Sequence, residues 1–347
     1  MVFSYHLTKY PFRLVYAILS LCGRTKGIYF YCAEQIDLEV FREIQRHLHS
    51  VDIVTDKKSM LKYFLDHKIP CKQLPVFPKA VIMCRHACHK FPSQRIIKIG
   101  MRHGPYHFKK MTSASNYNLF DIYMFSSQDD LAEAIKTGVK TGISIGYPKL
   151  DPALNGEFSQ KELSTIKIKA GITADKPILL FSATWPGSGM SGLDLWKHRI
   201  GSLKDKYNLM VTLHPWVSDA DRELIRKQGI YLVERDVIKH IYISDIVIGD
   251  TSSLLAEACA LDKPMITWKV PAAKRSQEKI EALIESFSLQ VESLDELRIA
   301  VKRYLATPNL LSDERHKASR LMFDNLDGSA GKNAANVIIK LLPELKL

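Results

Sequence analysis

Along the chain, short apolar runs alternate with amphipathic stretches. The first apolar run, 27–33, is rich in residues that favour strands. It precedes 37–48, where Leu38 and Phe41 lie on one predicted helical face. Further strands are predicted at 51–55, 80–84, 95–100, 121–127 and 141–146, and helices at 58–67 and 128–138. Such alternation predicts a parallel sheet covered by helices on both faces.

A second alternation follows a polar stretch between about Asp151 and Lys176. Strands are predicted at 177–185, 207–215, 230–234, 245–250 and 263–269, and helices at 193–204, 219–229, 236–244, 252–262 and from about 276. We therefore expect an α/β protein with a GT-B-like fold, in which two Rossmann-like domains with parallel sheets face each other. The expected divisions are an N-terminal segment at 1–26, domains at 27–151 and 177–329, a linker at 152–176, and a C-terminal helix at 330–347 that can pack back on the first domain.

The N-terminal segment combines a short apolar stretch with flanking cations. Its apolar part, 10–23, falls short of the roughly 20 residues needed to span a bilayer. A secretory signal is one interpretation, with Cys22 near a lipoprotein-like cleavage site. Two other interpretations are a helix that contacts an anionic membrane and a helix that packs on its own domain. In a helix, one stripe would contain Phe12, Val15, Tyr16, Leu19 and Cys22.

Charge narrows the class of partner. The chain has 49 Lys+Arg and 37 Asp+Glu, a formal net charge of +12, so we expect an anionic partner such as nucleic acid, a phosphorylated substrate or an acidic membrane. The basic residues do not gather in an aromatic-interleaved strip, which argues against nucleic acid. A hydrophobic fraction of 46% excludes a disordered chain.

The six cysteines indicate reduced thiols in a cytosolic protein. One cluster offers possible zinc ligands, namely Cys84, His86, Cys88 and His89. A strand would put the first three on one face and His89 on the other, and the sequence has no second half-site. We therefore predict no metal site.

Ligands of open α/β sheets bind beyond the carboxyl ends of the strands. The most informative strand end lies in DIVIGDTSSLLAEACALDKP, whose turn consists of Asp250, Thr251, Ser252 and Ser253. The free N–H groups and positive end of the following helix, together with the hydroxyls, would cradle a phosphate. The same residues also cap helices that bind no ligand. Glu257 could accept hydrogen bonds from vicinal hydroxyls, or could be a solvated surface residue.

A histidine follows one strand in each half. His214 could donate to a phosphate or move a proton near neutral pH, with a structural histidine as the alternative. In the first half, His103 stands between Arg102 and Gly104, with Lys109 further along. Basic residues there suit an anionic acceptor, although a charged surface loop would look the same.

Together these segments resemble the CDP-glycerol glycerophosphotransferases of bacterial teichoic-acid assembly. The family's WHGTPLK is similar to RHGPYHFKK from Arg102, and its GxPRxD to GYPKLD at 146–151. Its YAPTWR resembles FSATWPG, and its KxHP resembles TLHP at His214. Its DYSSxxFDxxxxxKP aligns without gaps to DTSSLLAEACALDKP from Asp250, and the resemblance spans about 28–339.

The resemblance implies a reaction. The second domain would hold a CDP-linked glycerol or ribitol phosphate, an acceptor hydroxyl would attack it, and CMP would leave. His103 would be the base, while His214 and the turn at Ser252 and Ser253 would neutralise charge on the phosphates. No metal or other cofactor is required if the helix end and imidazoles supply the positive field. The implied enzyme is cytoplasmic and peripheral on the inner face of the plasma membrane, with a lipid-linked or polymeric anionic acceptor.

The implied site has two groups of residues. The donor group is Thr184, Asp250, Thr251, Ser252, Ser253 and Glu257. The acceptor or interdomain group is Arg102, Gly104, Lys109, Lys149 and Asp151. The chain departs from the family because Pro186 replaces the arginine of PTWR, and Glu257 replaces an aspartate. A GT-B glycosyltransferase, a nucleotide-sugar epimerase and a non-catalytic nucleotide-binding subunit of a polymer-assembly complex therefore remain alternatives.

Overall fold

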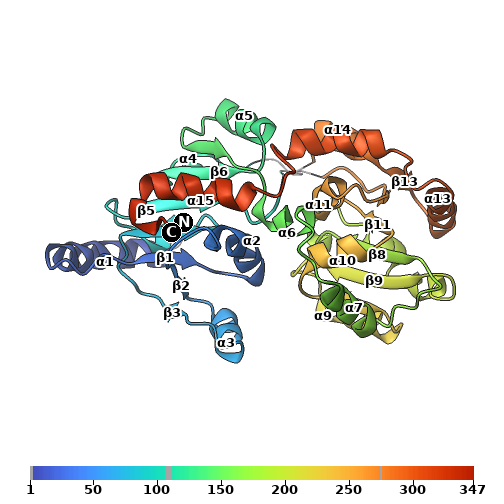
Figure 1. Cartoon of the computed structure of the whole chain (residues 1–347), viewed down its shortest axis with the longest axis horizontal. Coiled ribbons are helices and arrows are strands. Elements are labelled where there is room, and N and C mark those ends of the chain that lie inside the picture. The colour runs from blue at the N-terminus through green and yellow to red at the C-terminus, as the bar shows by residue number, and fades with distance from the viewer. Residues whose placement is uncertain (1–2, 107–110, 112, 274–275) are drawn as a thin grey trace. The chain divides into compact units, whose positions relative to one another are not determined.

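The computed structural model describes residues 3–106, 111, 113–273 and 276–347. The chain folds into two compact units (Figure 1). Unit 1 comprises 1–104, 112–151 and 329–347, and unit 2 comprises 105–111 and 152–328. Each unit has its own parallel sheet, so the predicted α/β class with two parallel sheets is confirmed.

The sheet of unit 1 has the order β3-β2-β1-β4-β5-β6-β7 and is parallel throughout. Its strands are β1 (Ile28–Tyr31), β2 (Asp52–Thr55), β3 (Lys72–Gln73), β4 (Ala80–Met83), β5 (Ile97–Met101), β6 (Ile122–Phe125) and β7 (Gly142–Ser144). Every residue of β1 and β4 is buried. Continuous burial of this kind is typical of parallel strands with both faces covered.

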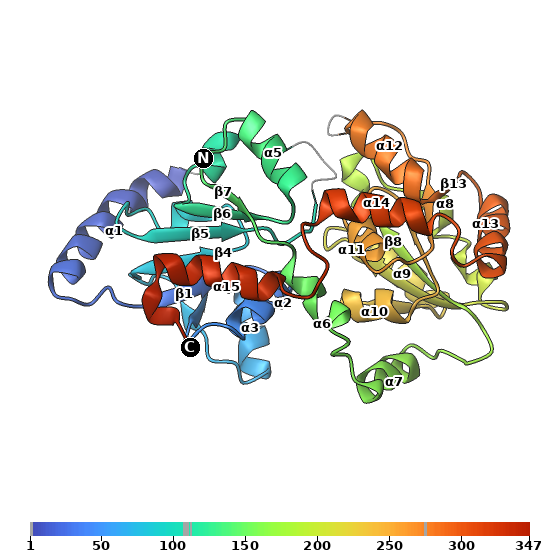
Figure 2. The same ribbon diagram turned by 45° about the horizontal axis from the view of Figure 1, so that its top comes forward.

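The helices of unit 1 come from both ends of the chain. They are α1 (Phe3–Leu21), α2 (Gln35–Gln45), α3 (Lys58–Asp66), α4 (Ala114–Tyr117), α5 (Gln128–Lys136) and α15 (Ala330–Leu341). Figure 2 shows α15, in red, along the sheet of unit 1, where it packs against α2. The approach is close, because a Cβ on Gly331 would lie 2.6 Å from the carbonyl oxygen of Glu43. Glycine at this position therefore lets the two helices pack.

The sheet of unit 2 has the order β10-β9-β8-β11-β12-β13 and is also parallel. Its strands are β8 (Ile178–Ala183), β9 (Asn208–Leu213), β10 (Tyr231–Val233), β11 (Ile246–Gly249), β12 (Met265–Trp268) and β13 (Leu289–Val291). Fully buried side chains such as Phe181, Trp196 and Ile248 form its core. This sheet places the ends of β8, β9 and β11 side by side.

The helices of unit 2 differ from the predicted ones in several places. They are α7 (Gln160–Lys169), α8 (Leu193–Trp196), α9 (Asp219–Lys227), α10 (Val237–Ile243), α11 (Leu254–Ala260), α12 (Glu278–Phe287), α13 (Leu294–Ala306) and α14 (Ser312–Met322), preceded at the unit boundary by α6 (Asp151–Leu154). The range expected as a linker contains α7, whose start has a Ser159–Glu162 capping box. The predicted helical tail includes strand β13, which at three residues is too short to show a period.

Helix α1 has one face on unit 1 and one face in solvent. Tyr16 is buried and donates a hydrogen bond from its hydroxyl to the Pro78 carbonyl, 3.0 Å away. The ring of Phe12 packs against that of Phe77 at a tilt of 33°, with 4.8 Å between the ring centroids. The predicted stripe is therefore split, because Val15 and Cys22 are exposed, as are Tyr10, Leu14, Ile18 and Leu21. Within the described part of the chain, no helix is both long and apolar enough to cross a bilayer.

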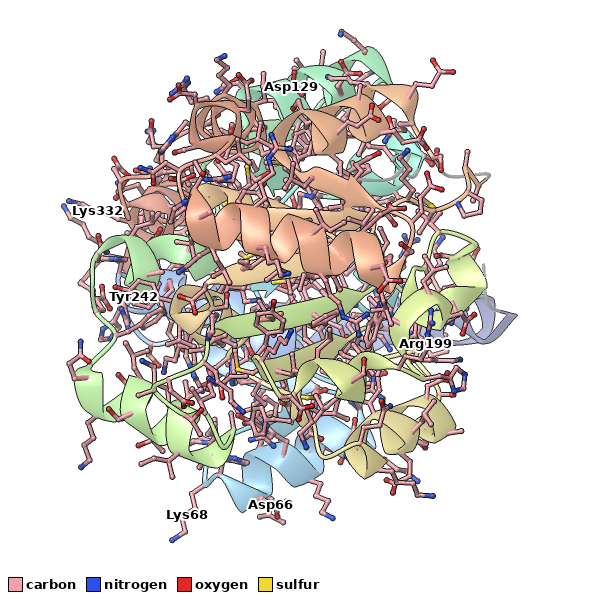
Figure 3. All side chains as sticks on the ribbon, turned by 90° about the vertical axis from the view of Figure 1, so that its right-hand side faces the viewer. Asp66, Lys68, Asp129, Arg199, Tyr242 and Lys332 are labelled. Carbon is pink, nitrogen blue, oxygen red and sulfur yellow. The ribbon has the colours of Figure 1, made fainter. Side chains whose placement is uncertain are left out.

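Charged side chains extend from the surface of each unit (Figure 3). Lys68 follows α3 and Lys332 lies on α15, and both are exposed and point away from the ribbon. Exposure of this kind is usual for lysine.

Candidate active site

In unit 2, Asp250 organises two loops at the carboxyl edge of the sheet. Its carboxylate, which is 2% exposed, accepts backbone hydrogen bonds from Thr184 and Gly192 beyond β8, both at 2.9 Å. It also accepts from Thr251 (2.6 Å) and Ser252 (3.1 Å) in its own turn. Burial raises the pKa of Asp250, and the surrounding N–H donors oppose that rise. Asp250 therefore holds the loops after β8 and β11 together, which is a different role from the predicted direct contact with a donor.

Thr184 and Thr251 are also directed into the protein. Thr251 is 8% exposed, and its hydroxyl donates to the Met190 carbonyl at 3.0 Å. Thr184 is 3% exposed and lies 3.5 Å from Thr251, measured between the hydroxyl oxygens. Both side chains therefore support the loop geometry, and their role in binding a donor stays a prediction.

Ser252 and Ser253 are the half-exposed residues of the same turn. The Ser252 hydroxyl accepts a hydrogen bond from Leu254 N at 3.4 Å, while Ser253, the N-cap of α11, makes no side-chain cap. Helix α11 begins at Leu254, two residues later than the predicted helix. Glu257 is 4% exposed on α11, so the alternative of a solvated surface residue is wrong. Of the predicted donor group, the two serines are the residues that are half-exposed, and their contact with a donor stays a prediction.

His214 is exposed directly after β9, beside the end of β8. Its Nδ1 accepts a hydrogen bond from the Trp216 backbone N–H at 3.2 Å. A neutral imidazole that accepts at Nδ1 carries its proton on Nε2. His214 is therefore held as an Nε2–H donor, the form that can bind a phosphate oxygen. The exposed indole of Trp216 flanks it and contacts Trp185 edge to face, with ring centroids 5.1 Å apart.

His103 in unit 1 has its ring proton on the opposite nitrogen from His214. Its Nδ1 lies 3.2 Å from the Cys84 carbonyl oxygen, which can only accept, so Nδ1 carries the proton and Nε2 carries the lone pair. The residue is exposed to solvent, while protein atoms around its ring withhold part of its hydration. Burial, and next the positive charge of Arg85, lower the pKa of His103 to about 4. His103 is therefore neutral at pH 7 and has the protonation state of a general base.

Most of the predicted acceptor group has structural partners within unit 1. Arg102 forms a buried ion pair with Asp130 on α5. Lys149 is buried and lies 3.4 Å from a carboxylate oxygen of Glu39. The Asp151 carboxylate accepts from the N–H groups of Ala330 (3.2 Å) and Gly331 (2.6 Å) at the start of α15. These contacts give the three residues structural partners, and their acceptor or interdomain role stays a prediction.

The remaining predicted residues of unit 1 are Gly104 and Lys109. Gly104 is half-buried and follows His103 directly. Lys109 lies outside the described residues.

In the cysteine–histidine cluster of unit 1 the two cysteines are buried, whereas His86 and His89 are exposed. Cys84 and Cys88 are buried, and His86 stacks on Tyr123 with 5.5 Å between ring centroids. Burial is the main cause that lowers the pKa of His86. In the part of the chain that the structure describes, no three His, Cys, Asp or Glu side chains are grouped so that they could hold a metal ion.

Sequence reasoning missed two features of these sites. Gly192 donates to Asp250 from a loop that no motif indicated. Tyr147, in GYPKLD, donates a hydrogen bond from its hydroxyl to the His103 carbonyl at 2.8 Å. A tyrosine before a proline is common in turns, so the sequence gives no sign of its hydrogen bond to His103 and only the fold shows it.

The comparisons of sequence indicate one family. Residues 96–340 match the CDP-glycerol:poly(glycerophosphate) glycerophosphotransferase family. The teichoic acid ribitol-phosphate polymerase TarL of Staphylococcus aureus is 26% identical over 200 residues, which cover 54% of this chain and 34% of TarL. A teichoic acid poly(glycerol phosphate) polymerase of Bacillus spizizenii is 31% identical over 137 residues, covering 37% of this chain and 34% of that protein. The chain thus matches about a third of the length of these relatives.

A solved structure extends the likeness to the whole fold. The structure of the wall teichoic acid polymerase TagF matches 97% of this chain and 98% of its own, with a TM-score of 0.66 and 13% identity. TagF therefore supports the GT-B-like fold class, and the sequence match carries the family assignment. The chain belongs to the CDP-glycerol:poly(glycerophosphate) glycerophosphotransferase family.

Proposed function

We propose that this chain transfers a polyol phosphate, glycerol phosphate or ribitol phosphate, from a CDP-linked donor to a hydroxyl of a teichoic-acid-like surface polymer. The names of its relatives, ribitol-phosphate and glycerol-phosphate polymerases, support this substrate class. The observation that carries the proposal is the pair of histidines held in opposite tautomers, one as a proton acceptor and one as a donor.

In the proposed reaction, His103 Nε2 takes the proton of the acceptor hydroxyl as its oxygen attacks the β-phosphorus of the donor. The bond between that phosphorus and the oxygen bridging to the α-phosphate breaks. The bonding pair stays on the bridging oxygen, and CMP leaves. His103 suits the step because the Cys84 carbonyl occupies Nδ1–H, so the lone pair lies on Nε2.

Unit 2 would stabilise the charge that builds up on the phosphates. His214 offers Nε2–H at the end of β9, and the hydroxyls of Ser252 and Ser253 lie in the turn after β11. Donors fixed before the reaction, as Asp250 fixes this turn, lower the barrier because they need no reorganisation.

The test is release of CMP from CDP-glycerol and from CDP-ribitol in the presence of a lipid-linked acceptor. His103→Asn is the informative variant, because the Asn amide can still donate to the Cys84 carbonyl while Nε2 is lost. We expect a fall in kcat of about a hundredfold or more, the usual contribution of a positioned base. The matched control is His47→Gln, at an exposed histidine after α2. Wild-type turnover by a folded His103→Asn would refute the assignment, and turnover of a UDP-sugar alone would support the glycosyltransferase alternative.

We also propose that α1 holds the chain on an anionic membrane surface. Its inner face is occupied by Tyr16 and Phe12, which leaves Leu14, Ile18 and Leu21 exposed on the other. A half-buried amphipathic helix with such a face inserts shallowly into lipid headgroups.

Co-sedimentation with vesicles of phosphatidylglycerol and phosphatidylcholine tests this proposal. The double variant Leu14→Ser, Ile18→Ser should lose most binding. The control is Ile168→Ser on α7, which removes a side chain that is 79% exposed. Equal sedimentation of both variants with wild type would exclude α1 as the contact.

A further inference from the structure

Tyr147 is a buried tyrosine to which the proposed reaction gives no role. It is 3% exposed and lies after β7, between Gly146 and Pro148. Gly146 has a φ of +86°, in the region that favours glycine, and the ring of Pro148 restricts the chain on the other side. Tyr147 therefore lies between a glycine conformation that other residues rarely adopt and a proline that restricts the backbone.

Three strand ends of unit 1 meet at His103. The His103 loop follows β5, and the His103 carbonyl accepts the Tyr147 hydroxyl at 2.8 Å from the segment after β7. On the other side, the His103 ring donates from Nδ1 to the Cys84 carbonyl, directly after β4, at 3.2 Å. One hydrogen bond therefore holds the backbone of His103 and the other holds its ring.

We propose that Tyr147 is a positioning residue for His103, and that its hydroxyl fixes the loop so that the imidazole keeps the Nδ1–H tautomer with Nε2 as the proton acceptor. The inference rests on the proposed function, in which His103 Nε2 takes the acceptor proton. Tyr147 itself touches no reacting atom in this scheme.

The physical reason is the geometry of the bond to Cys84. At 3.2 Å it is already at the long end of the range for an N–H···O bond, so a small shift of the His103 backbone would break it. An imidazole without that bond is hydrated at both nitrogens and populates both tautomers. Only one of them presents a lone pair at Nε2.

The charged groups around His103 come from its own loop and from the segment after β4. Arg85 and Arg102 lower its pKa, and His86 does so more weakly. Arg85 is paired with Asp37 and Arg102 with Asp130, so the loss of the Tyr147 hydroxyl leaves these charges in place. A change in the titration of His103 would therefore report a change in the position of its ring.

The test is Tyr147→Phe in the full chain, with histidine labelled with ¹⁵N. The variant keeps the buried ring and removes the hydroxyl alone. The matched control is Tyr16→Phe, because Tyr16 is equally buried, at 3%, and also donates to a backbone carbonyl in unit 1. Long-range ¹H–¹⁵N spectra distinguish the two tautomers directly, without substrate.

We expect His103 to show the Nδ1–H pattern in wild type and in Tyr16→Phe, and a mixture in Tyr147→Phe. Its pKa should rise from about 4 toward the ordinary value of histidine as the ring moves away from Arg85 and from the protein atoms that withhold its hydration. We expect kcat for CMP release to fall about tenfold, within the range that a small misplacement can cost, with an unchanged KM for the CDP-polyol. An unchanged tautomer and pKa in Tyr147→Phe would overturn the proposal.

The design separates this inference from the function on which it rests. If wild type releases no CMP from any CDP-polyol, the proposed function fails, while the spectra still test the hydrogen bond. If wild type is active and Tyr147→Phe keeps both its spectrum and its kcat, the function stands and the positioning role falls.

Discussion

Asp250→Asn changes one atom at the point where two loops of unit 2 are joined. In wild type, Oδ1 accepts from Thr251 and Ser252, Oδ2 accepts from Gly192, and Thr184 lies within reach of both oxygens. An asparagine that keeps its oxygen at the Oδ1 position retains three of the four donors. Its amide NH₂ group then faces the Gly192 N–H. Both groups are donors, so the Gly192 N–H loses its acceptor.

The expected cost follows from that one orphaned group. A buried N–H left without a partner costs about 1–3 kcal/mol, and the bonds that remain lose their charge assistance. We therefore expect Asp250→Asn to lower the free energy of unfolding of unit 2 by about 2 kcal/mol. For a unit of this size the melting temperature should fall by about 6 °C.

Tryptophan fluorescence is a suitable measurement, since it reports unit 2 alone. The chain has four tryptophans, and all of them lie in unit 2. The matched control is Asp194→Asn in the same unit, where the side chain is 74% exposed and pairs with Lys197. That substitution should change the free energy of unfolding by about 0.5 kcal/mol or less.

Equal melting of Asp250→Asn and wild type would refute the reasoning, because it would mean that Asp250 does not hold the loops together. An equal decrease in the melting temperature of Asp194→Asn would also refute it, because the effect would then not depend on burial of the carboxylate. If Asp250→Asn melts early but binds CDP-glycerol normally at low temperature, Asp250 has a purely structural role.

Three further predictions concern the two histidines and the C-terminal helix. His214→Phe keeps a ring beside Trp216 and removes the Nε2–H donor, so kcat for CMP release should fall about a hundredfold in a folded protein. The acidic limb of kcat/KM should lie near pH 4, where His103 is protonated and ceases to act as a base, and activity should rise with pH through that value. Asp151→Ala removes the acceptor at the start of α15, and hydrogen exchange should show opening of α15 easier by about 1 kcal/mol.

Each of these predictions has a clear contrary result. Unchanged turnover by His214→Phe would remove His214 from the mechanism. An acidic limb near pH 6.5 that shifts on mutation of another residue would show that His103 is not the limiting base. Unaltered protection of α15 in Asp151→Ala would mean that packing on α2 alone retains the helix.

The sequence reached the fold class because parallel sheets with both faces covered leave a strong local pattern. Strands such as β8 and β9 are mostly apolar and are buried along their whole length, and the helices between them repeat apolar positions at helical spacing. Short elements leave no such pattern, and β13 was missed because three residues are too few to show a period. The polar segment before β8 was predicted as a linker, but it contains α7, which has a weak apolar face.

At the candidate sites, the sequence identified the histidines and the DTSS turn, because polar residues after buried strands are conspicuous. The sequence alone could not distinguish candidate ligand contacts from residues that hold the surrounding loops in place. Asp250, Lys149 and Asp151 all looked like ligand contacts, and each has a protein partner from a distant part of the chain.

The sequence by itself determined the alternation of strands and helices, the basic charge and the chemical types available at the strand ends, all of which are local properties. Only the tertiary structure decided how those groups are used. The proton of His103 is on Nδ1 because the Cys84 carbonyl lies beside it, and the proton of His214 is on Nε2 because the Trp216 N–H faces Nδ1. An imidazole has the same composition in both tautomers, so its role depends on the hydrogen-bond partner that the fold supplies.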